Sequence, residues 1–518
     1  MSDIEDLRNK FTRPGGAGTP NLPARQPEKK AAAKLPAVTA QPPAAAGSGD
    51  GASSGGIARL LETIGRLLSP KPRPPEAAAP EPPIFTVAVA TLGNDPEGAY
   101  NAQLLAVLKE RPALTIRPVG RVFTLENMED PVSVSALSVG LRQTIAQEGA
   151  DLLIWGAMVK DGYALYLSGA LYPDDDRPGS FGFATRFDLP VTLDAAMSDL
   201  LYGAVLSAAD AMSEAKKGAV RRLLPGVMQN LEALAVRPPI QLSLAQQRAA
   251  QVAYGHGAAV AALAGPPSQA DDWFEKALTI YRAAQKRLNR TDPDWEAGFL
   301  HRHIACLLTA RAERAKDPAG YLAEAVEEWR QAVQCFSRAS MPHDWASAHI
   351  RLGKALYRLD LVSGDTELLR EALQVLQASF QVYSRTETPQ KWADIMHDVA
   401  QVLQVYGDQL RKPDVLQRSI DACDSVLQIV ARERQPMAWA AAQNTLGSAL
   451  FLYDKHGGGT ANLDRAAAAL EAAAALFQTS GAKRPAQVAA RNLAHVRKLA
   501  EERRGRSRGV VDPGWARE

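Results

Sequence analysis

The chain has 518 residues, of which 46 % are hydrophobic and 6 % aromatic, and its net charge is only +2. This charge is too small to make nucleic acid or an anionic membrane the main partner. Three well-separated Cys argue against a disulfide framework and a Cys-based zinc site, and no run of about 18 apolar residues could span a bilayer. We therefore expect a soluble, cytoplasmic protein of about three domains.

Residues 1–83 hold 14 of the 34 Pro residues and are rich in Ala, Gly and Ser. Such a segment buries too little apolar surface to offset its chain entropy, so we predict a disordered tail. Within it, 57–68 has apolar residues spaced as on one helical face. This amphipathic helix could dock in a partner's groove, lie weakly on a membrane surface or pack back on its own chain. Its apolar residues are Ile57, Leu60, Leu61, Ile64 and Leu68.

Residues 84–235 alternate between strand and helix patterns. Runs of β-forming residues ended by turn residues predict five strands, and the helical period predicts three helices, in the order β-α-β-α-β-β-β-α. We expect a small mixed sheet with helices covering one face. The strands are predicted at 85–92, 114–122, 151–159, 163–171 and 181–189, and the helices at 97–108, 132–148 and 193–217.

Three features of this region are similar to those of a known protein family. They are the opening strand with its Gly93-Asn-Asp-Pro-Glu97 turn, the stretch from Gly149 to Gly156, and the hairpin that follows. Together they resemble the amino-terminal domain of the TolB-like family, found in bacterial proteins that place it before tetratricopeptide repeats. The chain departs from that family where Val-Ala-Thr-Leu replaces the common Leu-Pro-Phe at the end of the first strand.

Residues 241–502 contain a repeat of 47 residues. Trp345, Trp392 and Trp439 recur at this spacing, each three residues after a Pro, and we expect them in the core. A looser copy starts at Pro293, and a degenerate copy near Pro485 lacks the Trp. Each copy is followed by a second helical pattern, which predicts about five helical hairpins and a terminal capping helix. The second helices are expected at 322–336, 368–383, 415–430 and 463–477, and an earlier pair at 242–263 and 273–287.

The repeat resembles the tetratricopeptide repeat in a lengthened form. The resemblance implies a mainly α superhelix whose concave groove is lined by the first helix of each hairpin and binds other proteins. Aligning Gly353, Ala400 and Gly447 places polar side chains on that inner face, where they could hold an extended peptide by its backbone or a carboxylate, or simply be solvated. These residues are Ile350, Lys354, Tyr357, Arg358, His397, Gln401, Gln404, Asn444, Ser448 and Phe451.

No pattern supports catalysis, a cofactor or a metal site. The loop 93–98 has two glycines spaced as in a phosphate loop but lacks the Lys and Ser/Thr that should follow. The acidic run 174–176 could attract a hard cation, but a solvated loop is the better interpretation. His301 and His303 lie two apart on a helix and so cannot share a metal. The basic stretch 497–508 could touch RNA or an acidic protein, but a helix end fraying into a disordered tail over 503–518 fits better.

The sequence therefore predicts a non-catalytic scaffold or adaptor. It would bind partner peptides or helices in the repeat groove and use the tail helix as a second docking motif. Two alternatives stay open: a ligand- or nucleotide-sensing protein whose α/β domain signals to the repeats, and a peripheral membrane-associated assembly factor.

Overall fold

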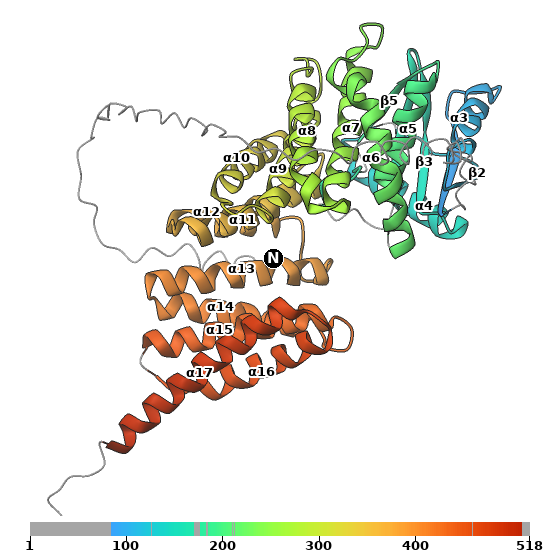
Figure 1. The fold of residues 1–518 in the computed structure, drawn as a ribbon. Coiled ribbons are helices and arrows are strands. Elements are labelled where there is room, and N and C mark those ends of the chain that lie inside the picture. The colour runs from blue at the N-terminus through green and yellow to red at the C-terminus, as the bar shows by residue number, and fades with distance from the viewer. Residues whose placement is uncertain are drawn as a thin grey trace, which may run out of the picture. The chain divides into compact units, whose positions relative to one another are not determined.

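The computed structural model describes most of the chain from residue 84 to residue 509. The predicted tail of residues 1–83, with its amphipathic helix, and the acidic run 174–176 lie outside the described residues. The described part forms five strands and fifteen helices, labelled as in Figure 1. The described ranges are 84–125, 127–169, 177–182, 185–209, 211, 213–457 and 459–509, with side chains described as far as 504.

A mixed sheet with the strand order β2-β1-β3-β4-β5 opens the described chain (Figure 1). Strand β1 is parallel to β2 and β3, whereas β4 is antiparallel to both of its neighbours. Four helices, α3 to α6, belong to this part of the chain. The bounds are β1 Phe85–Thr91, α3 Ala99–Lys109, β2 Leu114–Val122, α4 Pro131–Glu148, β3 Leu152–Val159, β4 Gly162–Gly169, β5 Phe187–Pro190, α5 Ala195–Ala208 and α6 Glu214–Val236.

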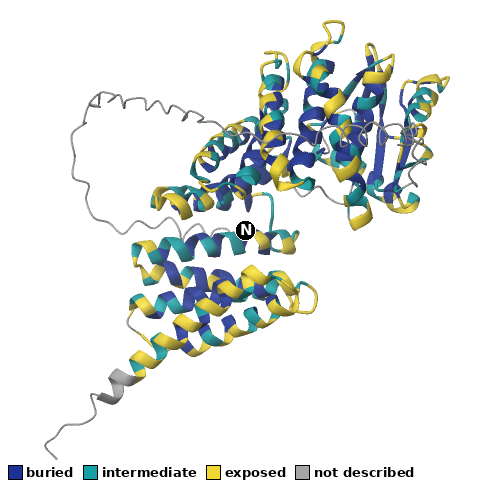
Figure 2. Ribbon diagram, in the orientation of Figure 1, coloured by how far each residue is buried: buried dark blue, intermediate teal, exposed yellow. Residues whose placement is uncertain are grey.

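Both faces of the sheet are covered, because alternate residues of β1 point to opposite sides. Val87 and Val89 belong to a cluster with Leu104 of α3 and with much of α5. Ala88 belongs to a separate cluster with Leu141 of α4. The expectation that helices cover only one face is therefore wrong. Figure 2 shows the buried residues following the strands and the inner sides of these helices.

The last strand is shorter than predicted. The pattern suggests a strand over 181–189, but only Phe187–Pro190 pairs with β4. Before it, Gly182 N donates to Thr185 Oγ1 at 3.1 Å. Among the described residues of this segment, pairing with β4 begins at Phe187.

The helix predicted over 193–217 is two helices. Helix α5 ends where Ala209 adopts an extended conformation. Ser213 then accepts a hydrogen bond from Lys216 N at 3.2 Å and caps the start of α6. A serine at this position satisfies an amide that would otherwise lack a partner, so it favours a new helix start.

Ten helices pair into five hairpins, and α17 follows them, which confirms the predicted mainly α architecture of five hairpins plus a capping helix. Helix α17 continues to Gly509, so it includes the first residues of the predicted basic tail. The hairpins are α7 Leu244–Ala264 with α8 Pro267–Gln285, α9 Asp294–Ala312 with α10 Ala319–Cys335, α11 Pro342–Ser363 with α12 Thr366–Ser379, α13 Pro389–Leu410 with α14 Pro413–Leu427, and α15 Pro436–Gly457 with α16 Leu463–Thr479, before α17 Lys483–Gly509.

The repeated Trp residues are buried or partly buried, and each has an arginine guanidinium over its ring. The arginine stands seven residues before the Trp in all three copies, just ahead of the Pro that begins the helix. Attraction between a cation and an aromatic ring stabilises this corner in every copy. The pairs are Arg338 with Trp345 at 5.9 Å, Arg385 with Trp392 at 5.3 Å and Arg432 with Trp439 at 5.3 Å.

The sheet and the first hairpins share one hydrophobic core, which extends from β1 through α5, α6 and α7 to α9. Two glycines of α7 make this possible. Gly257 lies against Met228 of α6, and Gly255 lies against the ring of Tyr281 in α8, so an added Cβ would overlap either neighbour. Helix α7, the first helix of the repeats, therefore packs closely against both the α/β part and its own hairpin partner α8.

The same close approach recurs inside the repeats and gives a stability prediction. A Cβ on Gly353 would lie 2.6 Å from Leu376 Cγ, and Leu376 is fully buried. Gly353→Ala should therefore lower the free energy of unfolding by about 1–3 kcal/mol, although alanine favours a helix. Urea unfolding followed by far-UV circular dichroism measures the change.

Gly320→Ala is the matched control, since Gly320 in α10 has no atom within 4 Å of the added Cβ. It should leave stability unchanged or raise it by up to about 1 kcal/mol. Equal effects of the two substitutions would contradict the close packing at Gly353.

Candidate functional site

A cleft of about 420 Å³ lies between the first helices of consecutive hairpins, α9, α11 and α13. Four of the ten residues predicted to bind a partner line it: Lys354, Tyr357, Arg358 and Gln401. Pro178, from the connection between β4 and β5, also reaches its wall. The cleft is defined below by Cys306 and Thr309 of α9, Glu313 just after the end of α9, Lys354, Tyr357 and Arg358 of α11, and Asp398 and Gln401 of α13.

Positive charges of α11 line one side of the cleft. Lys354 and Arg358 are four residues apart and so lie on the same face of the helix. Lys354 Nζ is 3.3 Å from Asp398 Oδ2, and Arg358 Nη1 is 2.8 Å from Glu313 Oε1. The side chains of the two cations are 40 % and 43 % exposed, so water screens both pairs and each contributes at most about 1 kcal/mol. Because the Glu313 side chain is 60 % exposed, an acidic group of a ligand can replace it beside Arg358 at little cost.

Tyr357 and Gln401 add neutral hydrogen-bonding groups to the cleft. Burial, with smaller contributions from Asp360 and Asp398, raises the pKa of Tyr357, so its phenol keeps its proton and can donate. The Gln401 amide can both donate and accept. An extended peptide backbone needs hydrogen-bond acceptors for its N–H groups and donors for its carbonyl groups.

The other predicted residues do not line the cleft. Ile350 and Ser448 are only 4 % and 6 % exposed, and Asn492 Nδ2 donates to Ser448 Oγ at 3.0 Å. His397 Nε2 lies 3.0 Å from Thr445 Oγ1, and burial lowers the pKa of His397. These contacts join neighbouring helices, and a role of these side chains in partner binding stays a prediction.

Three further predicted residues lie on α13 and α15. Gln404 is half-buried. The ring of Phe451 stacks against His495 of α17, with centroids 6.5 Å apart. Asn444 Oδ1 is buried and accepts no hydrogen bond from any described residue. Their role in partner binding is likewise a prediction.

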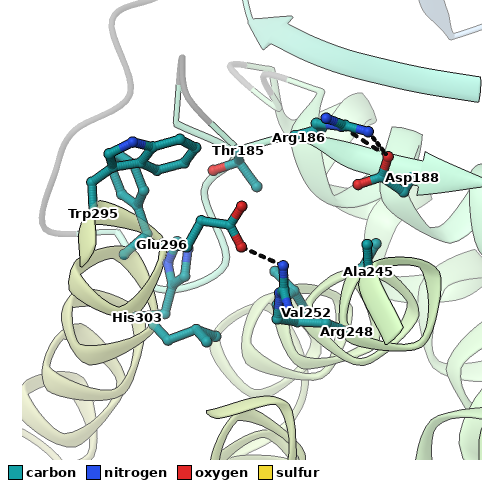
Figure 3. Close-up of a pocket in the computed structure, with 12 residues that line it drawn as sticks. Thr185, Arg186, Asp188, Ala245, Arg248, Val252, Trp295, Glu296 and His303 are labelled. Carbon is teal, nitrogen blue, oxygen red and sulfur yellow. Dashed lines mark hydrogen bonds and ion pairs between the residues drawn. The ribbon is translucent and has the colours of Figure 1, made fainter. Parts of the chain in front are cut away.

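A smaller cavity of about 70 Å³ lies where the edge strand β5 meets α7 and α9 (Figure 3). Beside the strand, Arg186 Nε donates to Asp188 Oδ1 at 2.8 Å. Across the cavity, Arg248 of α7 forms an ion pair with Glu296 of α9, and its Nη1 is 3.0 Å from Asp292 Oδ2. We call this the junction cavity, and its lining residues are Thr185, Arg186, Asp188, Ala245, Arg248, Ala249, Val252, Trp295, Glu296, Phe299, Leu300 and His303.

The carboxylates of the junction cavity are largely withdrawn from water. Burial raises the pKa of Asp188 and of Glu296, although the neighbouring arginines act in the opposite direction. Each carboxylate is held by an arginine, which offsets the cost of burying its charge. The cavity therefore presents fixed, charged acceptors to whatever enters it.

Two buried histidines lie at this cavity, of which His303 lines it and His256 packs against His303. His256 Nδ1 lies 2.6 Å from the Tyr281 hydroxyl, and the rings of His256 and His303 are 4.4 Å apart. Burial lowers the pKa of His256 to about 3 and that of His303 well below its usual range. Both imidazoles are therefore neutral in the folded protein at physiological pH.

Sequence reasoning did not find the junction cavity, because its residues come from positions 185–303 and meet only in the fold. The sequence pattern shows only that His303 cannot share a metal with His301, and in the structure His301 Nδ1 lies 2.6 Å from Glu328 Oε2. The alternating charges of Arg186 and Asp188 in a strand are the one local signal of a polar site at the sheet edge. Among the described residues, no group of three or more His, Cys, Asp or Glu side chains is placed to hold a metal ion.

No protein-family model matches this chain, and no curated protein sequence matches it either. Among solved structures, the chain is similar to one titled "Circular tandem repeat protein with novel repeat topology and enhanced subunit contact surfaces". The TM-score is 0.26 at 14 % identity, over 61 % of this chain and 87 % of that chain. So weak a likeness carries no argument, and the repeat architecture rests on the helices of this chain. None of the helices in the described part is long and apolar enough to cross a membrane.

The buried histidines give a pH prediction. Because the pKa of His256 falls from 6.5 to about 3 on folding, the unfolded chain binds more protons than the folded one below pH 6.5. When the pH is lowered from 6.5 to about 5, the free energy of unfolding therefore decreases by about 2 kcal/mol because of this histidine. His256→Phe should remove that part of the pH dependence, as urea unfolding at both pH values would measure.

His343→Gln is the control, because His343 is exposed on α11. It should keep the pH dependence of the wild type. If His256→Phe also keeps it in full, His256 is not held neutral by burial.

Proposed function

We propose that this protein is a non-catalytic scaffold or adaptor that holds a peptide or helix of a partner protein in the cleft. One observation carries the proposal: half-exposed cations and neutral polar groups from successive first helices line a single cleft of about 420 Å³. Water screens the ion pairs of Lys354 and Arg358, so an acidic ligand can compete for both cations. The predicted tail helix would act as a second docking motif.

The composition of the cleft favours an acidic segment in an extended conformation. A carboxylate of the partner would take the place of Glu313 beside Arg358, and a second one would approach the half-exposed Lys354. Gln401 and Tyr357 would bond the partner's backbone on either side. Because the cleft crosses three hairpins, one segment can contact several helices at once.

We further propose that the hairpins are tetratricopeptide-like and that the sheet with its helices is TolB-like. The 47-residue spacing of Trp345, Trp392 and Trp439 supports the first assignment, and the element order through α5 supports the second. On this reading the protein is a cytoplasmic bacterial protein. Ligand sensing by the α/β part is a second candidate function, which the junction cavity favours because β5 forms one of its walls.

Charge reversal in the cleft tests the scaffold function. Lys354→Glu combined with Arg358→Glu should weaken capture of the partner about tenfold or more, since two hydrogen bonds to charged groups are lost and like charges meet. Crosslinking mass spectrometry in the native host, with the full chain, identifies the partner and measures its recovery.

A matched control reverses two arginines on second helices, Arg282→Glu and Arg370→Glu, which are 45 % and 56 % exposed. It should recover the same partners as the wild type. Identical partner lists for the cleft variant and the wild type would contradict capture in the cleft.

A further inference from the structure

The junction cavity contains acceptor atoms that the protein itself leaves unused. Arg186 directs both Nε and Nη2 to the same oxygen, Asp188 Oδ1, at 2.8 and 2.6 Å. The ion pair of Glu296 with Arg248 uses Oε2. Among the described residues, none forms a hydrogen bond with Asp188 Oδ2, Glu296 Oε1 or the imidazole of His303. Figure 3 shows the two ion pairs on opposite sides of the space, with His303 below Glu296.

These acceptors suit a donor with several hydrogens. An ammonium group donates three hydrogen bonds and accepts none. The neutral imidazole of His303 can accept one, and the two carboxylate oxygens can accept the others. His303 is only 5 % exposed, lines the cavity and forms no hydrogen bond with a described residue, so its imidazole is available to a ligand there.

The charge of the cavity matches one positive charge. The charged groups that act on Glu296 are Arg248, Asp292, Asp188 and Arg186. Together with Glu296 itself, these are three carboxylates and two guanidinium groups. Arg302, which acts on His303, pairs with Asp344 and adds one charge of each sign, so one net negative charge remains. An anion would have to break an existing pair, because the arginines are already engaged by Asp188, Asp292 and Glu296. A monocation breaks none of these pairs.

The remaining walls set the size and kind of cation. Trp295 and Phe299 lie next to each other, with ring centroids 6.0 Å apart, and aromatic faces attract cations. Val252 and Leu300 provide apolar contact for a short alkyl chain. One bound water requires roughly 10–15 Å³ of cavity volume. The cavity of about 70 Å³ therefore holds an alkylammonium of roughly five non-hydrogen atoms.

We propose that the junction cavity binds a small primary alkylammonium ion, held by Asp188, Glu296 and His303 and flanked by Trp295. Asp188 lies in β5, whereas Glu296 and His303 lie in α9. The bound ammonium therefore ties the edge of the sheet to the second hairpin of the repeats. This site is separate from the cleft and does not depend on capture of a partner there.

Isothermal titration calorimetry of the full chain with n-propylammonium chloride tests the proposal. We expect saturable one-to-one binding in the millimolar range, and none with 1-propanol or with sodium chloride at the same ionic strength. Glu296→Gln keeps the shape but removes the charge, and it should weaken binding about tenfold or more. Asp188→Asn should weaken binding to a similar extent. If circular dichroism shows that Glu296→Gln does not fold, Asp188→Asn replaces it as the test variant.

The matched control is Glu328→Gln, which removes a carboxylate that pairs with His301 rather than with the cavity. It should bind n-propylammonium as the wild type does. Three results would each overturn the proposal: no saturable heat, equal binding of 1-propanol, or unchanged affinity in a folded Glu296→Gln or Asp188→Asn variant.

Discussion

Close approach of helices at residues without a side chain is the constraint on which the rest of this structure depends. Gly255 and Gly257 bring α7 against Tyr281 and Met228, and Gly353 does the same for α11 and Leu376. Because α7 contacts both the α/β part and α8, the sheet and the hairpins bury their apolar residues in one core. A larger residue at these positions would separate layers that must touch, so the low aromatic content of the chain and its small residues serve the same packing.

Helix α9 places the two candidate sites along one element. Glu296 and His303 line the junction cavity, and Cys306 and Thr309 line the cleft. The connection between β4 and β5 also contributes to both, with Thr185 in the cavity and Pro178 in the cleft. At about 1.5 Å per residue, His303 and Thr309 are only about 9 Å apart along the helix axis. A ligand that moves β5 relative to α9 can therefore change the wall of the cleft. In this way, ligand binding in the junction cavity could affect partner binding in the cleft, as the sensing hypothesis requires.

The repeats could be predicted from the sequence because each hairpin contacts mainly its neighbours, so local periodicity reports most of the fold. Four cleft residues followed from that periodicity. The burial of Ile350 and Ser448 did not, because it depends on packing between helices that spacing within one helix cannot show. The junction cavity combines β5, α7 and α9, and only tertiary structure brings Asp188 and Glu296 to the same space. Sequence reasoning missed the arginine above each Trp, although it recurs at the same spacing of 47 residues, at 338, 385 and 432.

The central functional claim is that the partner lies in the cleft, and site-specific photocrosslinking tests it most directly. A photoreactive amino acid at Gln401, which lines the cleft, should form covalent adducts with the partner in the native host. The same group at Gln417, exposed on α14, should form none with that partner. Adducts from Gln417 without adducts from Gln401 would show that partners bind the second helices and would contradict the account.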